Sequence, residues 1–481
     1  MVRHQIIVGP PGTGKTRTLV EQIDIHRMDR PDANVLFCSH TRAAASEAAS
    51  RFGAHSDAAS KRFRVSTLHS FCFEQIRASR DQTVDEVKLL PFLEQFDMDL
   101  SEGGDGKKYI DIMAYAAARK IAPLDAYDAF PSHPGSRGHF QAFVRSYDDW
   151  RHTYGYLDFA DMLLKYIKDV SRGTGLTLLA VDEAQDLTPL QWGVVEKIIA
   201  LNPGVEVIVA GDPDQALYTY MGAEPNGMYE MGTKLGATPS VLAQSFRVPA
   251  RVHAVANRIV QRIEGRIPAT YIPTSEEGEV TSTGDVVGLP YELACTPGET
   301  LVLYSDKFVR EQVEDELQAA LIPYRAISGM PGPLDTRAGR ALTFLHGMWA
   351  GIINTNDEEI AQRIKPALGP LGLDVWNSIG QEAVLEKLRE GRWDLLRIPR
   401  VHLEYLSRID YTASVRVKLS TIHGAKGMEA DHVHLLLDRS QGAMDYTFVD
   451  PSAQHRLFYV GVTRARKTLT TYEGMQNGYE L

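Results

Sequence analysis

The chain has 481 residues, of which 44% are hydrophobic and 23% charged, and its formal net charge is −11. This length allows several domains of ~100–200 residues each, no apolar run reaches the roughly 18 residues of a membrane span, and the N-terminal residues show no signal-peptide pattern. The three cysteines form no CxxC pair, so we expect a reducing, cytoplasmic setting and no disulfide scaffold. The negative charge argues against polyanion binding by the whole surface, although it allows a local basic groove.

The N-terminal stretch combines an apolar strand, a glycine-rich loop and a helix. Residues 5–8 are apolar, GPPGTGKT covers residues 9–16, and residues 17–26 have helical character. This order fits the phosphate loop GxxxxGK[ST], in which backbone N–H groups surround phosphates, Lys15 reaches the β- and γ-phosphates and Thr16 binds Mg²⁺. A chance glycine-rich turn is disfavoured because a strand precedes the loop and a helix follows it. The sequence therefore predicts a nucleoside triphosphatase.

A pair of carboxylates is predicted at a second strand tip, in the sequence VDEAQDLTP. The apolar run 176–181 reads as a buried strand, so Asp182 and Glu183 stand at its carboxyl end. Ligands of open parallel sheets bind at that end. One carboxylate can hold a metal ion while the other handles a water molecule.

Three further strands are predicted in the first half of the chain, at residues 34–38, 65–72 and 205–210. The second of them ends in polar groups that include His69, for which a structural role is the simpler interpretation. The third leads into a polar loop whose Gln215 suits a γ-phosphate sensor. Tyr218 and Tyr220 in the same loop offer stacking faces to bases, although simple packing is the usual role of such rings.

Two helical, charged stretches interrupt this pattern, at about residues 75–160 and 354–411. Strands and helices alternate again in the rest of the second half, as in an α/β domain without a phosphate loop of its own. Strands are predicted there at residues 298–304, 322–328, 415–421, 433–437 and 468–472, and helices at 308–321, 336–353 and 455–467.

Arg247 and Arg464 are assigned to this second domain, which has no phosphate loop. Each arginine taken alone is expected to be a surface residue. An arginine that stabilises charge on a transferring γ-phosphate accelerates hydrolysis about 10³–10⁵-fold, and if another domain supplies it, hydrolysis is coupled to domain closure. Repeated closure and release against a bound polymer would make the protein a motor.

Taken in order from residue 9 to residue 467, these segments resemble the motifs of the UvrD/Rep/PcrA-type DNA helicases of superfamily 1A. The resemblance implies an α/β fold with two RecA-like parallel-sheet P-loop domains and helical insertions, in a compact form with a shortened second insertion. The implied division is residues 1–75 and 165–240 for the ATP-binding domain, 76–164 for its insertion, 241–353 and 412–481 for the second domain, and 354–411 for the second insertion.

The resemblance also implies roles in nucleotide binding. ATP would contact Gly9, Pro10, Pro11, Gly12, Thr13, Gly14, Lys15 and Thr16, with Arg17 and Phe246 on the adenine and Glu429 at the ribose. Thr16 and Asp182 would hold Mg²⁺. The implied catalytic residues are Lys15, Asp182, Glu183 as the activator of water, Gln215 as the γ-phosphate sensor, and the arginine fingers Arg247 and Arg464.

Single-stranded DNA is the implied partner, together with single-strand/duplex junctions. The matching residues are Thr41, Arg42, Thr67, His69, Ser70, Tyr218, Tyr220, Thr421 and His423. The implied activity is an ATP-dependent DNA translocase and helicase of 3′-to-5′ polarity, of the kind used in DNA repair or replication. Three alternatives stay open: a motor that strips proteins or needs a protein loading partner, a nucleotide-switched protein-binding module, and a small-molecule kinase.

The chain departs from the family pattern at several positions. The family's glutamine motif upstream of the phosphate loop has no counterpart here. Ser39 and His40 stand where an aromatic residue is frequent, and Tyr220 and Met221 replace a Trp-Arg or Phe-Arg pair. A lost stacking platform is worth ~1–3 kcal/mol. We therefore expect nucleotide hydrolysis to persist and DNA affinity to be weaker.

Overall fold

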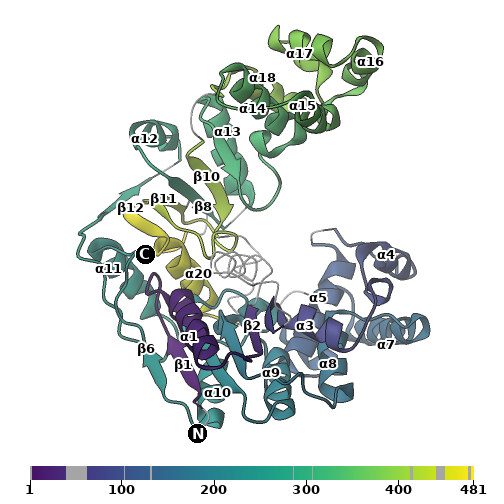
Figure 1. The fold of residues 1–481 in the computed structure, drawn as a ribbon, viewed down its shortest axis with the longest axis vertical. Coiled ribbons are helices and arrows are strands. Elements are labelled where there is room, and N and C mark those ends of the chain that lie inside the picture. The colour runs from purple at the N-terminus through teal and green to yellow at the C-terminus, as the bar shows by residue number, and fades with distance from the viewer. Residues whose placement is uncertain are drawn as a thin grey trace. The chain divides into compact units, whose positions relative to one another are not determined.

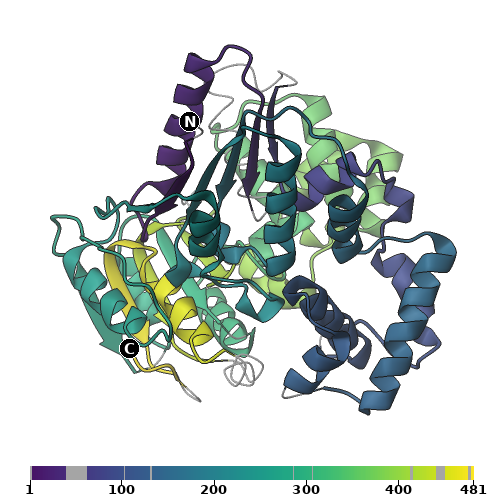
Figure 2. The same cartoon turned by 90° about the horizontal axis from the view of Figure 1, so that it is seen from below.

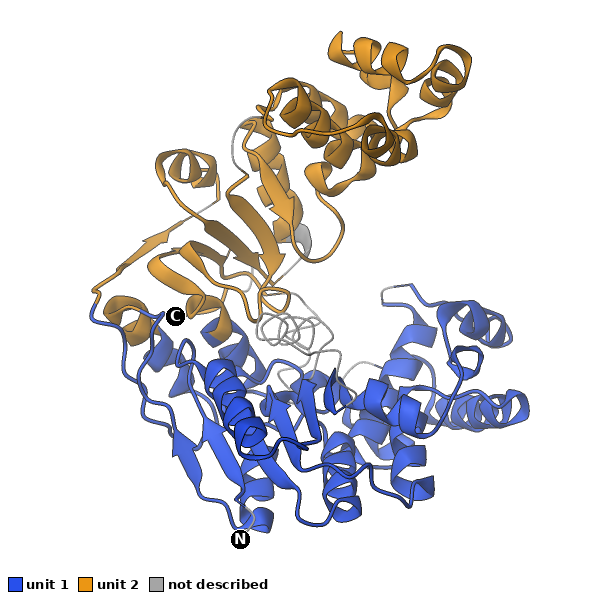
Figure 3. Ribbon diagram, in the orientation of Figure 1, with its two compact units in different colours: residues 1–248, 256–275, 441–459 blue, residues 249–255, 276–440, 460–481 orange. Residues whose placement is uncertain are grey.

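The computed structural model describes residues 3–39, 62–101, 103–130, 133–284, 286–305, 307–411, 415–439, 450–474 and 478–481. The chain divides into two compact units (Figure 3). Unit 1 comprises residues 1–248, 256–275 and 441–459, and unit 2 comprises residues 249–255, 276–440 and 460–481. Within the described ranges, no helix combines the length and the apolar character needed to cross a membrane.

Unit 1 is built on a parallel sheet with the strand order β3-β2-β4-β5-β1-β6. The strands are β1 Gln5–Val8, β2 Val35–Ser39, β3 Phe63–Ser66, β4 Leu178–Asp182, β5 Glu206–Gly211 and β6 Pro239–Val241. The central strands β2 and β4 are buried along their whole length. Such continuous apolar strands are typical of parallel sheets covered by helices on both faces.

Two groups of helices accompany this sheet. The helices connecting its strands are α1 Lys15–Asp29, α3 Leu68–Gln75, α8 Phe159–Asp169, α9 Pro189–Leu201 and α10 Gly227–Leu235. The predicted first insertion is helical, with α4 Glu86–Glu94, α5 Asp105–Arg119, α6 Pro123–Ala129 and α7 Arg137–Tyr154. The insertion has its own largely aromatic core, which includes Phe92, Tyr109 and Phe143. Its helices lie beside α3 and α8 (Figure 1), and Figure 2 shows them in blue as a separate group.

Unit 2 contains a second parallel sheet, with the order β7-β12-β11-β8-β10-β9. Its strands are β7 Glu279–Thr283, β8 Thr300–Tyr304, β9 Tyr324–Ala326, β10 Val417–Thr421, β11 Ala430–Leu436 and β12 Ala465–Tyr472. The two parallel sheets confirm the predicted α/β class.

The helices of the second half include two that cross the boundary between the units, α11 Ala250–Val260 and α20 Ala453–Val462. The others are α12 Leu289–Cys295, α13 Lys307–Ala319, α14 Arg337–Trp349, α15 Asp357–Ile364, α16 Pro370–Ile379, α17 Gln381–Arg389 and α18 Arg400–Arg408. The helices at residues 357–408 agree with the predicted helical character of the second insertion. They share one apolar core with β8, α13 and α14, in which Val302, Leu342 and Leu388 are completely buried.

Two sequence-based predictions of secondary structure are wrong. The strand predicted at 65–72 ends at Ser66, and α3 begins at Leu68. The hydroxyl of Thr67 accepts a hydrogen bond from the Ser70 N–H at 3.2 Å, so this threonine caps the helix. The helix predicted at 455–467 ends at Val462, because the chain enters strand β12 at Ala465.

Candidate active site

The phosphate loop runs between β1 and α1 and is shaped by glycines. Gly12 and Gly14 have φ angles of 75° and 83°, in the left-handed region that favours glycine. Gly14 is the N-cap of α1 and supplies no capping side chain, so the first N–H groups of the helix are available to an anion. The Lys15 ammonium donates to the carbonyl of Gly9 at 2.5 Å, and a Cβ on Gly9 would lie 2.5 Å from Lys15 Cγ. The loop therefore folds closely around Lys15.

The predicted metal-binding residues meet although they are far apart in the sequence. Asp182 is the last residue of β4, and its Oδ2 accepts a hydrogen bond from the Thr16 hydroxyl at 2.9 Å. Its Oδ1 accepts from the backbone N–H of Glu183 at 2.9 Å. A hydroxyl and a carboxylate at one point are oxygen ligands of the kind that Mg²⁺ prefers. The residues present thus fit the metal that the phosphate loop implies.

Burial shifts the protonation of this centre. Asp182 is 4% exposed, and its burial, followed by the nearby charge of Glu183, raises its pKa to about 6. Burial lowers the pKa of Lys15, while the carboxylates of Asp212, Glu183 and Asp182 act in the opposite direction. Such perturbed groups at a strand tip are typical of functional sites.

Two glutamine side chains join the carboxylate pair to the predicted sensor loop. Gln185 Nε2 donates to Glu183 Oε2 at 2.5 Å, and Gln185 Oε1 accepts from the Asp212 N–H at 3.0 Å. Gln215 Nε2 in turn donates to Asp212 Oδ2 at 2.7 Å. Sequence reasoning assigned no role to Gln185 or Asp212. Both residues lie next to predicted site residues, in DEAQD and GDPDQ, and this proximity is the sequence feature that indicates a role for them.

The segment that carries Phe246 and Arg247 packs on the phosphate loop and belongs to unit 1, whereas the sequence assigned Arg247 to the domain without a phosphate loop. The Phe246 N–H donates to the Gly12 carbonyl at 2.8 Å, and a Cβ on Gly12 would lie 2.5 Å from Arg247 Cβ. The Phe246 ring is 78% exposed, as a residue that stacks on a base requires. Arg17, the other predicted adenine contact, lies exposed in the first turn of α1 and pairs with Glu21 at 2.9 Å.

The other predicted nucleotide residues lie in unit 2. Arg464 is 2% exposed, so the expectation that it is a surface residue is wrong. Its Nε donates to the Val460 carbonyl at 2.9 Å and its Nη1 to the Met428 carbonyl at 3.3 Å. Glu429 lies 3.4 Å from the Nε of Arg466. Arg464 thus joins the end of α20 to the turn before β11.

The predicted DNA contacts fall into three places. Thr41 and Arg42 lie outside the described residues. Thr67, His69 and Ser70 form the start of α3, in unit 1. Thr421 is the last residue of β10 and His423 follows that strand, in unit 2. The third place is the turn after the sensor loop, with Tyr218 and Tyr220.

The aromatic residues of these places have partial exposure. The His69 ring meets the Phe159 ring edge-on at 5.6 Å. The rings of Tyr218 and Tyr220 lie 6.3 Å apart, and Tyr220 is 43% exposed. Gly222 ends this turn with a φ of 92°, and a Cβ there would lie 2.9 Å from Ala118 Cβ of α5. The turn therefore packs against the first insertion.

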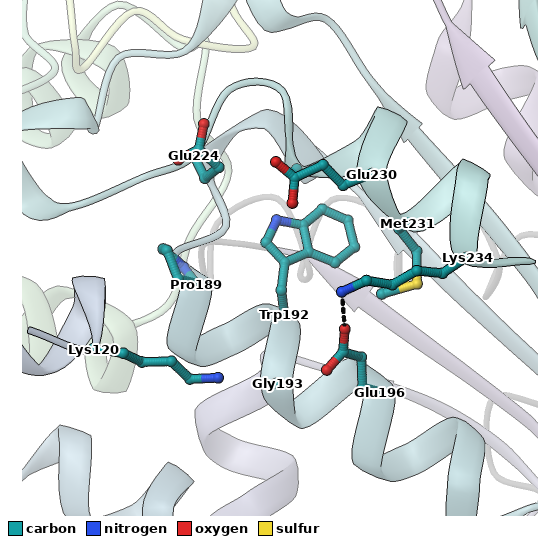
Figure 4. Close-up of a pocket in the computed structure, with 10 residues that line it drawn as sticks. Lys120, Pro189, Trp192, Gly193, Glu196, Glu224, Glu230, Met231 and Lys234 are labelled. Atoms are coloured by element: carbon teal, nitrogen blue, oxygen red, sulfur yellow. Dashed lines mark hydrogen bonds and ion pairs between the residues drawn. The ribbon is translucent and has the colours of Figure 1, made fainter.

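A separate small cavity lies among α9, α10 and the end of α5 (Figure 4). Its volume is about 220 Å³, and its lining residues include Trp192, Glu224 and Glu230. Glu196 and Lys234 on its wall pair at 2.5 Å. None of the predicted site residues lines the cavity, so it does not belong to the candidate active site.

The fold and this site define an α/β protein with a P-loop nucleotide site. Residues 2–235 match the UvrD/REP helicase N-terminal domain, and residues 387–472 match the UvrD-like helicase C-terminal domain. The chain belongs to the UvrD/Rep helicase family, and its two sheets are those of two RecA-like domains.

Two relatives show how far this similarity extends. The ATP-dependent DNA helicase UvrD2 of Mycobacterium tuberculosis is 26% identical over 408 residues, which cover 74% of this chain and 55% of that protein. DNA helicase II of Salmonella typhimurium is 24% identical over 412 residues, covering 75% of this chain and 54% of that protein. The chain thus spans little more than half the length of these relatives. The crystal structure of arterivirus nonstructural protein 10 (helicase) aligns with 98% of this chain and 59% of the viral chain, at 12% identity and a TM-score of 0.35.

Proposed function

We propose that the chain is an ATP-dependent motor that moves along single-stranded DNA in the 3′-to-5′ direction and unwinds duplexes at junctions. The observation that carries this proposal is the hydrogen-bonded series from Thr16 through Asp182 and Glu183 to Gln215, in a chain of the UvrD/Rep family. The relatives named above as DNA helicases support it. The four-part domain division given by the resemblance belongs to the same proposal.

The residues of the site would act on ATP as follows. The loop at residues 9–16 would hold the phosphates, and Thr16 and Asp182 would hold Mg²⁺, which neutralises phosphate charge when bound. Glu183 would accept the proton of the attacking water, and Gln185, which donates to Oε2 of Glu183, orients that carboxylate. Gln215 would contact the γ-phosphate.

Arginines and aromatic residues complete the proposed cycle. Arg247 and Arg464 would stabilise the charge on the transferring phosphate, as arginine fingers do. Tyr218 and Tyr220 would stack on bases of the single strand, helped by polar contacts from Thr67, Ser70 and the other predicted DNA residues. Closing and opening of the two domains around ATP would then move the DNA.

The first test compares the ATPase rate with and without single-stranded DNA, with Lys15→Ala as the blank. We expect stimulation by DNA, because both units must engage before hydrolysis becomes fast. Duplexes with a 3′ or a 5′ tail then test polarity, and only the 3′-tailed duplex should be unwound. A rate that is independent of DNA would contradict the motor and leave the nucleotide-switched module.

One observation favours a second candidate, a motor of the same fold that does not unwind by itself. Ser39 is 3% exposed at the end of β2 and offers no stacking face, and the exposed Met221 carries no charge for a phosphate. A weaker DNA track would suit a motor that strips proteins or needs a loading partner. Displacement of streptavidin from biotinylated single strands without unwinding of tailed duplexes would identify it.

A further inference from the structure

A segment that contains none of the predicted site residues is fixed to the phosphate loop. We call residues 262–274 of unit 1 the strap. The Tyr271 hydroxyl donates to the Pro11 carbonyl at 3.0 Å, and the same carbonyl accepts from the Ser245 hydroxyl at 3.0 Å. Ile272 exchanges backbone hydrogen bonds of 2.8 Å with Ala243 and Ser245. One part of the strap is therefore anchored on the loop that would bind the phosphates of ATP.

The other part of the strap reaches the sensor loop. Arg266 Nε donates to Asp214 Oδ2 at 2.7 Å, and the two side chains are 16% and 8% exposed. The Asp214 N–H donates to Asp212 Oδ1 at 3.1 Å, and Asp212 Oδ2 accepts from the Gln215 amide at 2.7 Å. The guanidinium of Arg266 is therefore linked through two aspartates to the predicted γ-phosphate sensor.

The charges around Asp214 show why an arginine is needed there. Burial, followed by the charge of Asp212, raises the pKa of Asp214 to about 7, and Arg266 acts against this shift. Arg456 is a second cation nearby, but its Nη1 pairs with Asp450 Oδ2 at 3.0 Å. Removing one partner of a buried pair leaves an uncompensated charge, which is strongly unfavourable. Arg266 is the cation that donates directly to Asp214.

We propose that Arg266 is a positioning residue for nucleotide recognition. By holding Asp214 it fixes the loop at residues 212–215, so that Gln215 distinguishes a nucleoside triphosphate from a diphosphate. Through Tyr271 the strap keeps this loop in register with the phosphate loop. The inference rests on the proposed function and deepens it, because it assigns the discrimination between ATP and ADP to a residue outside the predicted site.

The test compares Arg266→Gln with the wild-type full chain in binding and in hydrolysis. Dissociation constants are measured for ADP and for a non-hydrolysable ATP analogue, and kcat and KM are measured for ATP. We expect the dissociation constant of the ATP analogue to rise about tenfold relative to that of ADP. The affinity for ADP itself should change less than about twofold, and kcat should fall at least about tenfold. A role in folding alone would weaken both nucleotides together.

Three further variants complete the test. Arg258→Gln removes an exposed charge of the same unit and should leave the ratio unchanged. Asp214→Asn combined with Arg266→Gln removes both buried charges. The ratio of the two dissociation constants should then return part of the way to the wild-type value. If Arg266→Gln does not fold, Arg266→Lys keeps the charge without the planar fork, and a smaller shift of the same sign is expected.

The outcomes separate this inference from the proposed function. A folded Arg266→Gln or Arg266→Lys variant with the wild-type ratio, or an equal loss of affinity for both nucleotides, would overturn the positioning role. A wild-type chain that hydrolyses no ATP would instead contradict the proposed function itself.

Discussion

Glu183 stands at the tip of β4 in a left-handed conformation, with a φ of 54°. Replacing it by glutamine keeps the shape of the side chain and leaves the Thr16–Asp182 hydrogen bond untouched, but it removes the proton acceptor. We expect Glu183→Gln to lower kcat about 10²–10⁴-fold while nucleotide affinity stays near that of the wild type. Single-turnover hydrolysis and nucleotide titration measure the two effects.

Glu206 provides the matched control for this change. It belongs to β5 but pairs with His26 at 2.8 Å and Arg30 at 3.1 Å, at the start of the strand. Glu206→Gln should leave turnover intact. Wild-type turnover in Glu183→Gln would show that another group activates the water.

The raised pKa of Asp182 gives a second prediction at the residue scale. With a folded pKa of about 6 against an ordinary value of 3.8, the native protein holds this proton more tightly than the unfolded chain does. Protonation therefore stabilises the nucleotide-free protein, and this stability is lost as the pH rises from about 4 to about 6. At pH 7, Asp182→Asn should therefore increase the unfolding free energy by at most a few kcal/mol and raise the melting temperature. The same change should abolish hydrolysis.

The pH dependence distinguishes this effect from a general change in packing. The gain of Asp182→Asn should be full above about pH 6 and should shrink as the pH falls toward 4, because Asp182 then becomes neutral in both states. Melting curves without nucleotide at several pH values measure it. A gain that is the same at every pH would contradict the assigned charge effect.

At the scale of elements, the phosphate loop offers a pair of glycines with different surroundings. Gly12 and Gly14 have nearly the same φ, but a Cβ on Gly12 would meet Arg247 Cβ and Ser245 Oγ, whereas a Cβ on Gly14 meets nothing within 4 Å. Alanine in the left-handed region costs roughly 1–2 kcal/mol. Without nucleotide, Gly14→Ala should show only that loss, and Gly12→Ala an additional ~1–3 kcal/mol from overpacking.

Thermal unfolding of the nucleotide-free protein measures both variants. Equal melting temperatures would mean that the segment 245–247 does not pack on the loop in solution. That result would also remove Phe246 from the proposed adenine site, because its backbone hydrogen bond to Gly12 places it there.

Elements were predictable from the sequence where local chemistry determines them. The strand at residues 5–8 and the helix after the phosphate loop are confirmed, because apolar runs and glycine positions specify them. The strands β6 and β7 were not predicted. Both lie at sheet edges and expose most of their residues, so they lack the apolar pattern that marks a central strand. The pattern around Thr67 predicts a strand because a capping threonine after a strand resembles its continuation.

In the predicted site, too, the motifs predict some contacts, whereas others depend on packing between distant positions. The motifs predict Thr16 and Asp182 at one metal ion, and the two side chains are hydrogen-bonded, since the carboxyl ends of parallel strands meet at one edge. The contacts of Arg266 with Asp214 and of Arg464 with the Met428 carbonyl join positions with no common motif. These contacts form only through tertiary packing, so the sequence pattern does not predict them.

At the scale of the whole molecule, the decisive question is whether unit 2 takes part in hydrolysis. Arg464 is the residue that tests it, because it belongs to unit 2 while its proposed role concerns the phosphate bound by unit 1. We expect Arg464→Ala to slow DNA-stimulated ATP hydrolysis by about 10³-fold or more, with little change in ATP affinity. The same change removes buried hydrogen bonds to the carbonyls of Val460 and Met428, so the melting temperature should also fall.

A control and a second variant separate the two effects of this change. Lys467→Ala removes a nearby charge that pairs with Asp431 at 3.0 Å and is 63% exposed, and it should alter neither rate nor stability. Arg464→Lys keeps a cation but not the planar fork that bonds two carbonyls, so it should melt earlier yet retain more hydrolysis than Arg464→Ala. If Arg464→Ala remains folded and hydrolyses ATP at the wild-type rate, the second unit does not supply an arginine to the reaction. Arg247, which belongs to unit 1, would then be the remaining predicted arginine finger. Hydrolysis would not depend on unit 2, and the proposed coupling of hydrolysis to domain movement would be contradicted.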